Sequence, residues 1–280
     1  MSASISARRA AFRRLHESGC FLIPNPWDVG SARWLEGLGF QALATTSSGA
    51  AWAHGKPDGA MTLDEILAHF RALVAATDLP VNADFEDGHA RDAHGLADNI
   101  ARCIETGVAG LSIEDSTGDD AKPLYDFDEA VARMRVARAA VDAAGGDVLL
   151  VGRAECFLTG HPEPLKEATK RLVAYAEAGA DCLYAPGVRT RQEIETIVRA
   201  VAPKPVNVLA GWPIGFTLDE LGEMGVRRVS VGGALARSAW GGFMRAAQEL
   251  AEGRFDGFAS AAPGDELNAF FTDRERRRRS

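Results

Sequence analysis

The stretch Val81-Asn82-Ala83-Asp84-Phe85-Glu86-Asp87-Gly88 ends an apolar segment in three carboxylates and a glycine. Side chains alternate between the two faces of an extended strand, so Asn82, Asp84 and, if the strand continues, Glu86 face the same way. A carboxylate on a buried face is costly unless it is paired or binds a metal. The stretch therefore predicts a metal site at the end of a buried strand, provided that the rest of the chain forms a barrel.

Around this strand, helical patterns alternate with short β-rich runs. Four helical segments end at a glycine that is followed by an apolar run, and glycine suits the left-handed position that closes a helix. These glycines are Gly39, Gly107, Gly179 and Gly225. Four further apolar runs are expected to be strands, at Phe21 to Pro24, Pro80 to Asp84, Val148 to Arg153 and Pro205 to Leu209. About eight strands alternating with helices over roughly 250 residues predict an α/β fold, a (β/α)8 TIM barrel.

A doubly wound open sheet is the alternative, and two features favour the barrel. No glycine-rich phosphate loop follows the first strand, where an open dinucleotide-binding sheet would carry one. Polar clusters instead follow most of the strands, and the active sites of barrels assemble from such strand ends. The clusters are Asn25 to Asp28, Thr45 to Ser48, Asp84 to Asp87, Glu114 to Ser116, Arg153 to Glu155, and Asn207.

We expect one domain over residues 1–280, with the barrel at about 20–252 and a C-terminal extension at 253–280. Asp28 is expected to cap a helix that runs to Leu38. Within the extension, a short helix is expected at Asp265 to Phe271, followed by a frayed basic tail at Arg274 to Ser280.

The composition is that of an ordinary globular protein, with 46% hydrophobic and 25% charged residues. The 31 Lys and Arg against 39 Asp and Glu give a net charge of -8, which argues against nucleic-acid or anionic-membrane binding. No apolar run has the length of a signal peptide or a membrane span, so we expect a cytoplasmic protein. The four cysteines are widely spaced and are expected to be free thiols.

Further carboxylates come from neighbouring strand ends. Glu114 and Asp115 end the strand that follows, and Asp58 lies in the preceding loop. Oxygen ligands without clustered histidine or cysteine suit Mg²⁺ or Mn²⁺ better than zinc. For Asp87, Asp115 and Asp28, a structural role as helix cap or ion-pair partner stays open.

Five motifs together resemble the isocitrate lyase and phosphoenolpyruvate mutase superfamily, in its order and spacing, from about Phe21 to about Leu250. They are Asn25-Pro26-Trp27-Asp28-Val29-Gly30-Ser31-Ala32-Arg33, Thr45-Thr46-Ser47-Ser48-Gly49 leading to Lys56-Pro57-Asp58, Asn82-Ala83-Asp84, Ile113-Glu114-Asp115, and Gly152-Arg153-Ala154-Glu155.

The resemblance implies a barrel whose C-terminal helix is exchanged with a neighbouring subunit in a homodimer or homotetramer. It implies Mg²⁺, with Mn²⁺ as a substitute, bound at the strand ends together with a small carboxylate substrate. Asp84 and Glu114 would belong to the metal site, Asp58 would orient water or substrate, and Arg153 would clamp the anion. Thr46, Ser47 and Ser48 would offer amides and hydroxyls to the substrate. From the residues themselves, Asn82 and Glu86 are further metal candidates, and Trp27 and Asn207 are further substrate candidates, with packing at the barrel rim as the equal alternative for Trp27.

Two departures from the family pattern limit this transfer. The family has Asp-x-Asp where we align Asn82-x-Asp84. Glu86 and Asp87 are candidates to compensate for the lost charge, and weaker metal binding before substrate arrives is the alternative. The lyases carry a lysine-arginine-cysteine-glycine-histidine motif after the glutamate, whereas Asp115 to Tyr125 contains neither cysteine nor histidine. The mutase-type Asp-Lys pair is also absent, although Lys122 lies nearby. The sequence therefore argues against an ordinary isocitrate or methylisocitrate lyase.

The sequence predicts a Mg²⁺-dependent lyase or decarboxylase that cleaves a C–C bond in a small 2-oxo or 2-hydroxy carboxylate through an enolate. One alternative is a P–C bond enzyme, either a phosphonomutase or a phosphonopyruvate hydrolase. Another is a catalytically degraded carboxylate-binding protein. The substrate, the general acid or base and the oligomer size stay open, and His89 is the best placed of the loop histidines.

Overall fold

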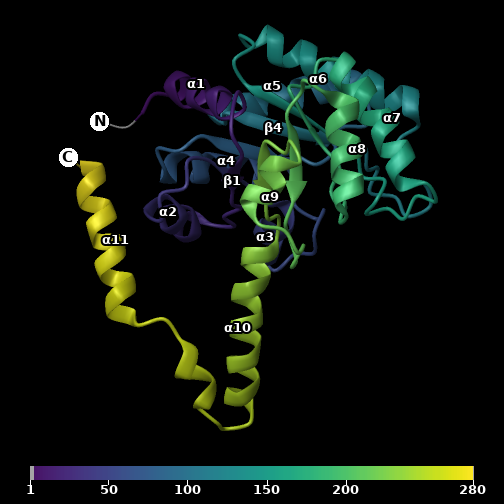
Figure 1. Ribbon diagram of the computed structural model, residues 1–280. Coiled ribbons are helices and arrows are strands. Elements are labelled where there is room, and N and C mark those ends of the chain that lie inside the picture. The colour runs from purple at the N-terminus through teal and green to yellow at the C-terminus, as the bar shows by residue number, and fades with distance from the viewer. Residues whose placement is uncertain (1–2, 280) are drawn as a thin grey trace.

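Eight parallel strands form a nearly closed barrel (Figure 1). The structure, a computed structural model, describes residues 3–279. The strands pair in the order β1-β8-β7-β6-β5-β4-β3-β2. Between the two end strands, β1 and β2, the Ala44 amide donates to the Pro24 carbonyl at 3.0 Å, which brings the barrel close to closure. The predicted (β/α)8 barrel is confirmed. The strands are β1 (Phe21–Ile23), β2 (Leu43–Ala44), β3 (Val81–Asp84), β4 (Gly110–Glu114), β5 (Leu149–Arg153), β6 (Cys182–Tyr184), β7 (Val206–Leu209) and β8 (Arg228–Ser230).

Helices connect the strands, and several begin at a side-chain cap. Asp28 caps α2 as predicted, since its carboxylate accepts a hydrogen bond from the Ser31 amide at 2.7 Å. The helices are α1 (Ile5–Leu15), α2 (Val29–Gly37), α3 (Ser47–Ala53), α4 (Leu63–Ala76), α5 (Ala93–Glu105), α6 (Phe127–Ala143), α7 (Pro164–Glu177), α8 (Arg191–Val201), α9 (Leu218–Glu223), α10 (Ala234–Ala251), the 3₁₀ helix η1 (Asp256–Ser260) and α11 (Gly264–Arg279).

The barrel interior is closed at the amino-terminal ends of the strands by α1. Phe12 of α1 is fully buried in the cluster that fills the barrel, which also contains Ile23 and Val151. A methyl group on Gly110 would lie 2.7 Å from the Phe12 ring, so only glycine leaves room for this plug. Phe12 therefore forms the floor of the barrel, opposite the end at which the strands finish.

Three arginines fasten α1 to the barrel through main-chain carbonyls. Arg8 donates to the Val74 and Thr77 carbonyls, and Arg9 donates to those of Ile104 and Val108. Arg13 donates to the carbonyls of residues 146–148. These carbonyls lie near helix C-termini and just before strands, where main-chain oxygens have spare capacity to accept a hydrogen bond.

A polar layer lies just above this floor. Arg228 is buried, and its guanidinium donates to Asn207 Oδ1 at 2.8 Å and to Asn82 Oδ1 at 3.4 Å. His16 approaches the same guanidinium through Nε2 at 3.5 Å, while its Nδ1 lies 2.8 Å from the Phe12 carbonyl. Because a carbonyl only accepts, Nδ1 carries the proton, and because a guanidinium only donates, Nε2 is the acceptor and His16 is neutral. Burial and the Arg228 charge lower the pKa of His16 to about 3.

We expect acid to destabilise the protein through His16. The unfolded chain takes up a proton on His16 below about pH 6.5, whereas the folded chain does so only near pH 3. The contribution of neutral His16 to the free energy of unfolding is therefore fully present above pH 6.5 and falls as the pH is lowered. The loss is about 1.4 kcal/mol of unfolding free energy per pH unit. Urea unfolding from pH 7 to pH 4.5 measures this slope. His16→Gln should flatten it, whereas His94→Gln, at an exposed position, should not. An unchanged slope in His16→Gln would contradict this assignment.

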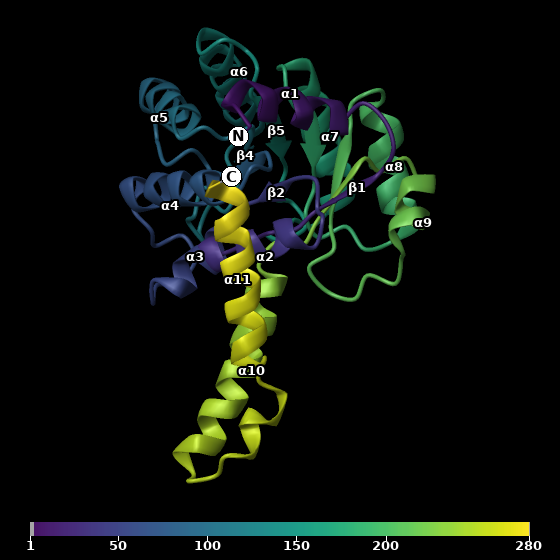
Figure 2. The same cartoon turned by 90° about the vertical axis from the view of Figure 1, so that its left-hand side faces the viewer.

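The C-terminal segment leaves the barrel. Figures 1 and 2 show α10 projecting away from it, and α11 returning beside α2. Phe270 packs on Trp34 of α2 with ring centroids 4.5 Å apart. The short helix predicted at Asp265 to Phe271 is too short, because α11 runs from Gly264 to Arg279 and so includes most of the predicted frayed tail. Ser280 lies outside the described residues.

Candidate functional site

Charged side chains meet at the carboxyl ends of β3, β4 and β5. The strand register places Glu114 of β4 beside Arg153 of β5. Arg153 Nη1 lies 3.0 Å from Asp84 Oδ1 and 3.0 Å from Glu114 Oε2, while its Nε donates to Glu155. The guanidinium also lies over the Tyr184 ring, 5.3 Å from its centroid. The structure therefore brings together three of the predicted site residues, Asp84, Glu114 and Arg153.

Negative charge exceeds positive charge in this cluster. Burial raises the pKa of Glu114 well above its usual value, Arg153 opposes the rise, and Glu155, Asp84 and Glu86 increase it. The pKa of Glu155 is raised for the same first reason, burial. A single guanidinium thus faces several carboxylates that repel one another, so an additional cation would be favoured there.

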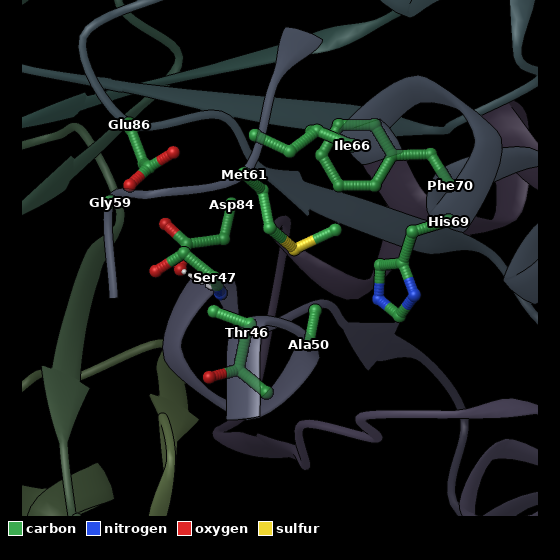
Figure 3. A pocket seen from close by; sticks show the side chains of 11 residues that line it. Thr46, Ser47, Ala50, Gly59, Met61, Ile66, His69, Phe70, Asp84 and Glu86 are labelled. Atoms are coloured by element: carbon green, nitrogen blue, oxygen red, sulfur yellow. Dashed lines mark hydrogen bonds between the residues drawn. The ribbon is translucent and has the colours of Figure 1, made fainter. Parts of the chain in front are cut away.

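The start of α3 joins the cluster from the other side. The Ser47 amide donates to Asp84 Oδ2 at 3.0 Å, and Figure 3 shows Ser47, the first residue of α3, next to Asp84. Burial raises the pKa of Asp58, the neighbouring Asp84 and Glu86 charges add to the rise, and a hydrogen bond with the Ser47 side chain opposes it. Thr46 caps α3, and its Oγ1 lies 3.1 Å from Ser48 Oγ. Asp58 and Ser47 therefore belong to the same group as Asp84.

Glu86 reaches this site from a loop, because β3 ends at Asp84. Both Glu86 and His89 adopt left-handed backbone angles, with φ of 48° and 53°. Such conformations are costly for residues with side chains and are typical of functional loops. Glu86 Oε2 lies 3.1 Å from His89 Nε2, and both residues line an open cavity of about 570 Å³ with Asp58 and Glu114. Glu86 therefore borders the mouth of the site.

Three predicted residues lie elsewhere. Asn82 faces the same way as Asp84 but one layer deeper, where it bonds Arg228 and the Ala83 carbonyl. Asn207 is also in this layer and is satisfied by Arg228 and Ser230. Trp27 packs beside Gly49 and lines a separate pocket between α2 and α11. The structure therefore does not join Asn82 to the carboxylate cluster, and it gives Asn207 an interior role.

Several other polar residues are engaged in structural contacts. Asp87 accepts from the Tyr125 hydroxyl at 3.0 Å and from the His89 amide. Lys122 pairs with Asp126 at 2.7 Å and is half exposed. The four cysteines are free, as expected. For these residues the structural alternatives explain the side chains.

Glu155 and Tyr184 also contact Arg153. The sequence indicates Glu155 only as the partner in a structural ion pair with Arg153, and Tyr184 only as a minor contact. The sequence signal for Glu155 was its position two residues after an arginine that ends an apolar strand. Side chains two apart on an extended segment face the same way, so this spacing favours the Arg153–Glu155 pair that the structure contains. Tyr184 follows from the register, since it is the β6 partner of Arg153.

The donor chemistry fits a hard divalent cation. Within residues 3–279, no three His, Cys, Asp or Glu side chains already form a ready-made metal cage. Asp84 and Glu114 nevertheless point their oxygens at one nitrogen of Arg153, and Asp58 and Glu86 add nearby carboxylates. Mg²⁺ is typically held by one or two carboxylates, with water and substrate completing its shell. The carboxylates present therefore fit Mg²⁺ or Mn²⁺.

The family model described as phosphoenolpyruvate phosphomutase matches residues 12–251. The chain belongs to this family. The predicted membership of the isocitrate lyase and phosphoenolpyruvate mutase superfamily is thereby confirmed. Two relatives match this member of the phosphoenolpyruvate phosphomutase family over nearly its whole length. An uncharacterized protein of Mycobacterium tuberculosis is 30% identical, over 95% of this chain and 98% of its own. An oxaloacetate decarboxylase of Rhodopseudomonas palustris is 32% identical, over 91% and 90%.

A solved structure resembles this phosphomutase-family chain closely. It is a Burkholderia cenocepacia protein whose assignment as a lyase or mutase is inferred. The TM-score is 0.92 and the sequences are 46% identical. The match covers 96% of this chain and 97% of that one. The likeness therefore extends over the barrel and the C-terminal helices together.

Proposed function

We propose that this protein is a Mg²⁺-dependent lyase or decarboxylase that cleaves a C–C bond next to the carboxylate of a small 2-oxo or 2-hydroxy acid, through an enolate. The observation that carries this proposal is the convergence of Arg153 with Asp84 and Glu114 at the strand ends. A cation for the substrate carboxylate and carboxylates for a metal lie side by side there, which is what such a reaction needs.

Each residue has a distinct task in this proposal. Arg153 donates to the substrate carboxylate, for which its planar guanidinium is suited. Asp84 and Glu114, with Glu86 nearby, hold Mg²⁺ or Mn²⁺. When bound, the ion supplies Lewis-acid stabilisation of negative charge on the substrate oxygens. Asp58, whose pKa is raised by burial, orients water or substrate through its carboxyl oxygens, and Ser47 fixes its direction.

Relatives support C–C cleavage, since the Rhodopseudomonas palustris relative is named an oxaloacetate decarboxylase. P–C chemistry is the second candidate because the matching family model is described as a phosphomutase. The degraded binding protein loses one of its two supports, while the missing acid in the loop after Glu114 remains the other. The neutral Asn82 that suggested it lies outside the carboxylate cluster.

Substrate assays test the proposal and separate the two reactions. The protein with Mg²⁺ is offered oxaloacetate, 2-methylisocitrate and phosphonopyruvate, while pyruvate and inorganic phosphate are measured. Pyruvate without phosphate supports C–C cleavage, and phosphate release from phosphonopyruvate supports the P–C alternative. Calorimetric titration with Mg²⁺ or Mn²⁺ in the presence of oxalate, an enolate mimic, is the second measurement. Absence of metal binding under these conditions would refute the enzyme proposal.

We also propose that the protein forms a homodimer or homotetramer in which α10 is exchanged between subunits. Phe243 and Met244 of α10 are each 62% exposed, and Leu22 on the outer face of β1 is 37% exposed. A groove of about 520 Å³ near Leu22 is lined mostly by apolar residues. Because α10 leaves the barrel, a second copy of it fits this uncovered face. A cytoplasmic location stays a prediction; no helix in the described part of the chain is long and apolar enough to span a membrane.

The double substitution Phe243→Asp and Met244→Asp should convert the assembly to monomers. Each aspartate would bury a charge in the apolar contact, which is strongly unfavourable. Light scattering coupled to size-exclusion chromatography measures the mass. Leu158→Asp, at a position 54% exposed outside α10, is the control and should keep the assembly. A monomeric wild-type protein would contradict the exchange.

A further inference from the structure

Behind the carboxylate cluster lies a second polar group that the proposed function does not use. Asp115 is buried, with 2% of its surface exposed. Its Oδ2 accepts from the Tyr175 hydroxyl at 2.6 Å and from Arg171 Nη1 at 3.0 Å. Its Oδ1 accepts from the Glu155 amide at 2.8 Å. Three donors thus hold one buried carboxylate, which is a strongly fixed arrangement.

Asp115 connects α7 with the site residue Arg153. Tyr175 and Arg171 both belong to α7, whose position is set by packing against the barrel. Asp115 follows Glu114 directly in the chain, and it fixes the main chain at Glu155. The Glu155 carboxylate accepts from Nε of Arg153, whose other edge meets Asp84 and Glu114. Hydrogen bonds therefore run without a break from the Tyr175 hydroxyl to Arg153.

The chain of contacts explains why Arg153 needs an external support. Asp84 and Glu114 both draw on Nη1, so these two contacts hold only one end of the guanidinium, which also lies over the Tyr184 ring. Glu155 at Nε supplies the second point that fixes its plane. A planar donor must have a fixed plane to bind a carboxylate with two parallel hydrogen bonds.

We propose that Tyr175, Asp115 and Glu155 form a positioning relay that sets the plane of the Arg153 guanidinium for carboxylate binding. Tyr175 acts at a distance and touches no substrate. The proposal rests on the proposed function for its effect on turnover, whereas its effect on Arg153 itself is independent of any activity. Loss of the Tyr175 hydroxyl should loosen Asp115, then Glu155, and finally Arg153.

The experiment compares Tyr175→Phe with the wild type by ¹⁵N NMR of arginine side chains in the full chain. The Arg153 Nε–H signal is assigned by its disappearance in Arg153→Lys. In Tyr175→Phe this signal should shift or broaden. With a substrate that the wild type turns over, KM for the carboxylate should rise about tenfold and kcat should change less, since a displaced guanidinium weakens carboxylate binding in substrate and transition state alike.

Tyr125→Phe is the matched control. Tyr125 is also a buried tyrosine that donates to a carboxylate, at 3.0 Å, but its acceptor is Asp87 and not Asp115. This variant should leave the Arg153 signal and KM unchanged. Asp115→Asn, which keeps an oxygen for the Glu155 amide, should give a smaller shift than Asp115→Ala. This gradation would tie the Arg153 signal to the oxygen that Asp115 offers to the Glu155 amide.

Two results would overturn the relay. One is an unshifted Arg153 signal in Tyr175→Phe, even if the melting temperature falls. The other is a shift of equal size in Tyr125→Phe, which would indicate a general loosening of the fold. If the wild type turns over none of the substrates, the proposed function fails, but the NMR comparison still decides the positioning claim.

Discussion

Asp84→Ala is expected to abolish turnover while the barrel stays folded. Asp84 is the residue at which the site comes together, since its two oxygens meet Arg153 and the Ser47 amide separately. Its removal takes away a metal ligand and the partner that holds α3 against the site. We expect kcat/KM to fall by at least about 10³-fold, because metal ligands and charge-stabilising groups each contribute on this scale. Steady-state kinetics and circular dichroism measure the two halves of the prediction.

Asn82→Asp is the informative control for Asp84. If Asn82 belonged to the metal site, a new carboxylate there would tighten Mg²⁺ binding. In the structure it faces Arg228, so the added charge should pair with that buried guanidinium and leave the Mg²⁺ affinity unchanged. Full activity in Asp84→Ala, or tighter metal binding in Asn82→Asp, would contradict the present assignment of the cluster.

Arg153→Lys is expected to lower kcat/KM by about 10²-fold or more. Lysine keeps one positive charge among the carboxylates, so the fold should persist, but it cannot donate from two edges of a plane. Arg153→Ala is a different case. It would leave Glu114 and Glu155 buried without a cation, and breaking such a buried pair costs about 3–5 kcal/mol. Kinetics together with thermal unfolding separate the two variants.

Arg138→Lys is the matched control for Arg153→Lys. The two arginine side chains are equally exposed, at 17%, and each contacts more than one carboxylate. Arg138 lies on α6, outside the site, and pairs with Asp142 and Asp181. Its replacement should change activity less than about twofold. An equal loss of activity in both variants would contradict a specific role for Arg153.

The barrel and most of the site could be predicted from local patterns. Apolar runs that end in Asp84, Glu114 and Arg153 indicate strands whose ends meet, and in a parallel barrel these ends share one rim. Alternation in a strand also placed Asn82 on the same side as Asp84, which is correct. Alternation does not reveal how far inside the barrel a side chain lies. Asn82 precedes Asp84 by two residues along β3, so it lies deeper, in the polar layer around Arg228, and not at the rim.

Contacts between distant segments account for the rest. Nothing near Asn207 in the sequence indicates that Arg228 binds it, since the two are 21 residues apart on neighbouring strands. The length of α11 was underestimated because its polar, arginine-rich end lacks an apolar period. In the structure, this helix is anchored on α2 through Phe270 and Trp34. Tertiary packing of this kind overrides local propensity.

The fastening of α1 has a consequence for biosynthesis. Arg9 binds the Val108 carbonyl across 99 residues, and Arg13 binds the Gly146 and Val148 carbonyls across 133 and 135. At a translation rate of roughly 5–20 residues per second, α1 waits on the order of ten seconds for these partners to leave the ribosome. α1 therefore cannot complete its docking until the chain through Val148 has been made, and a nascent chain that stalls before Val148 should present Phe12 to chaperones.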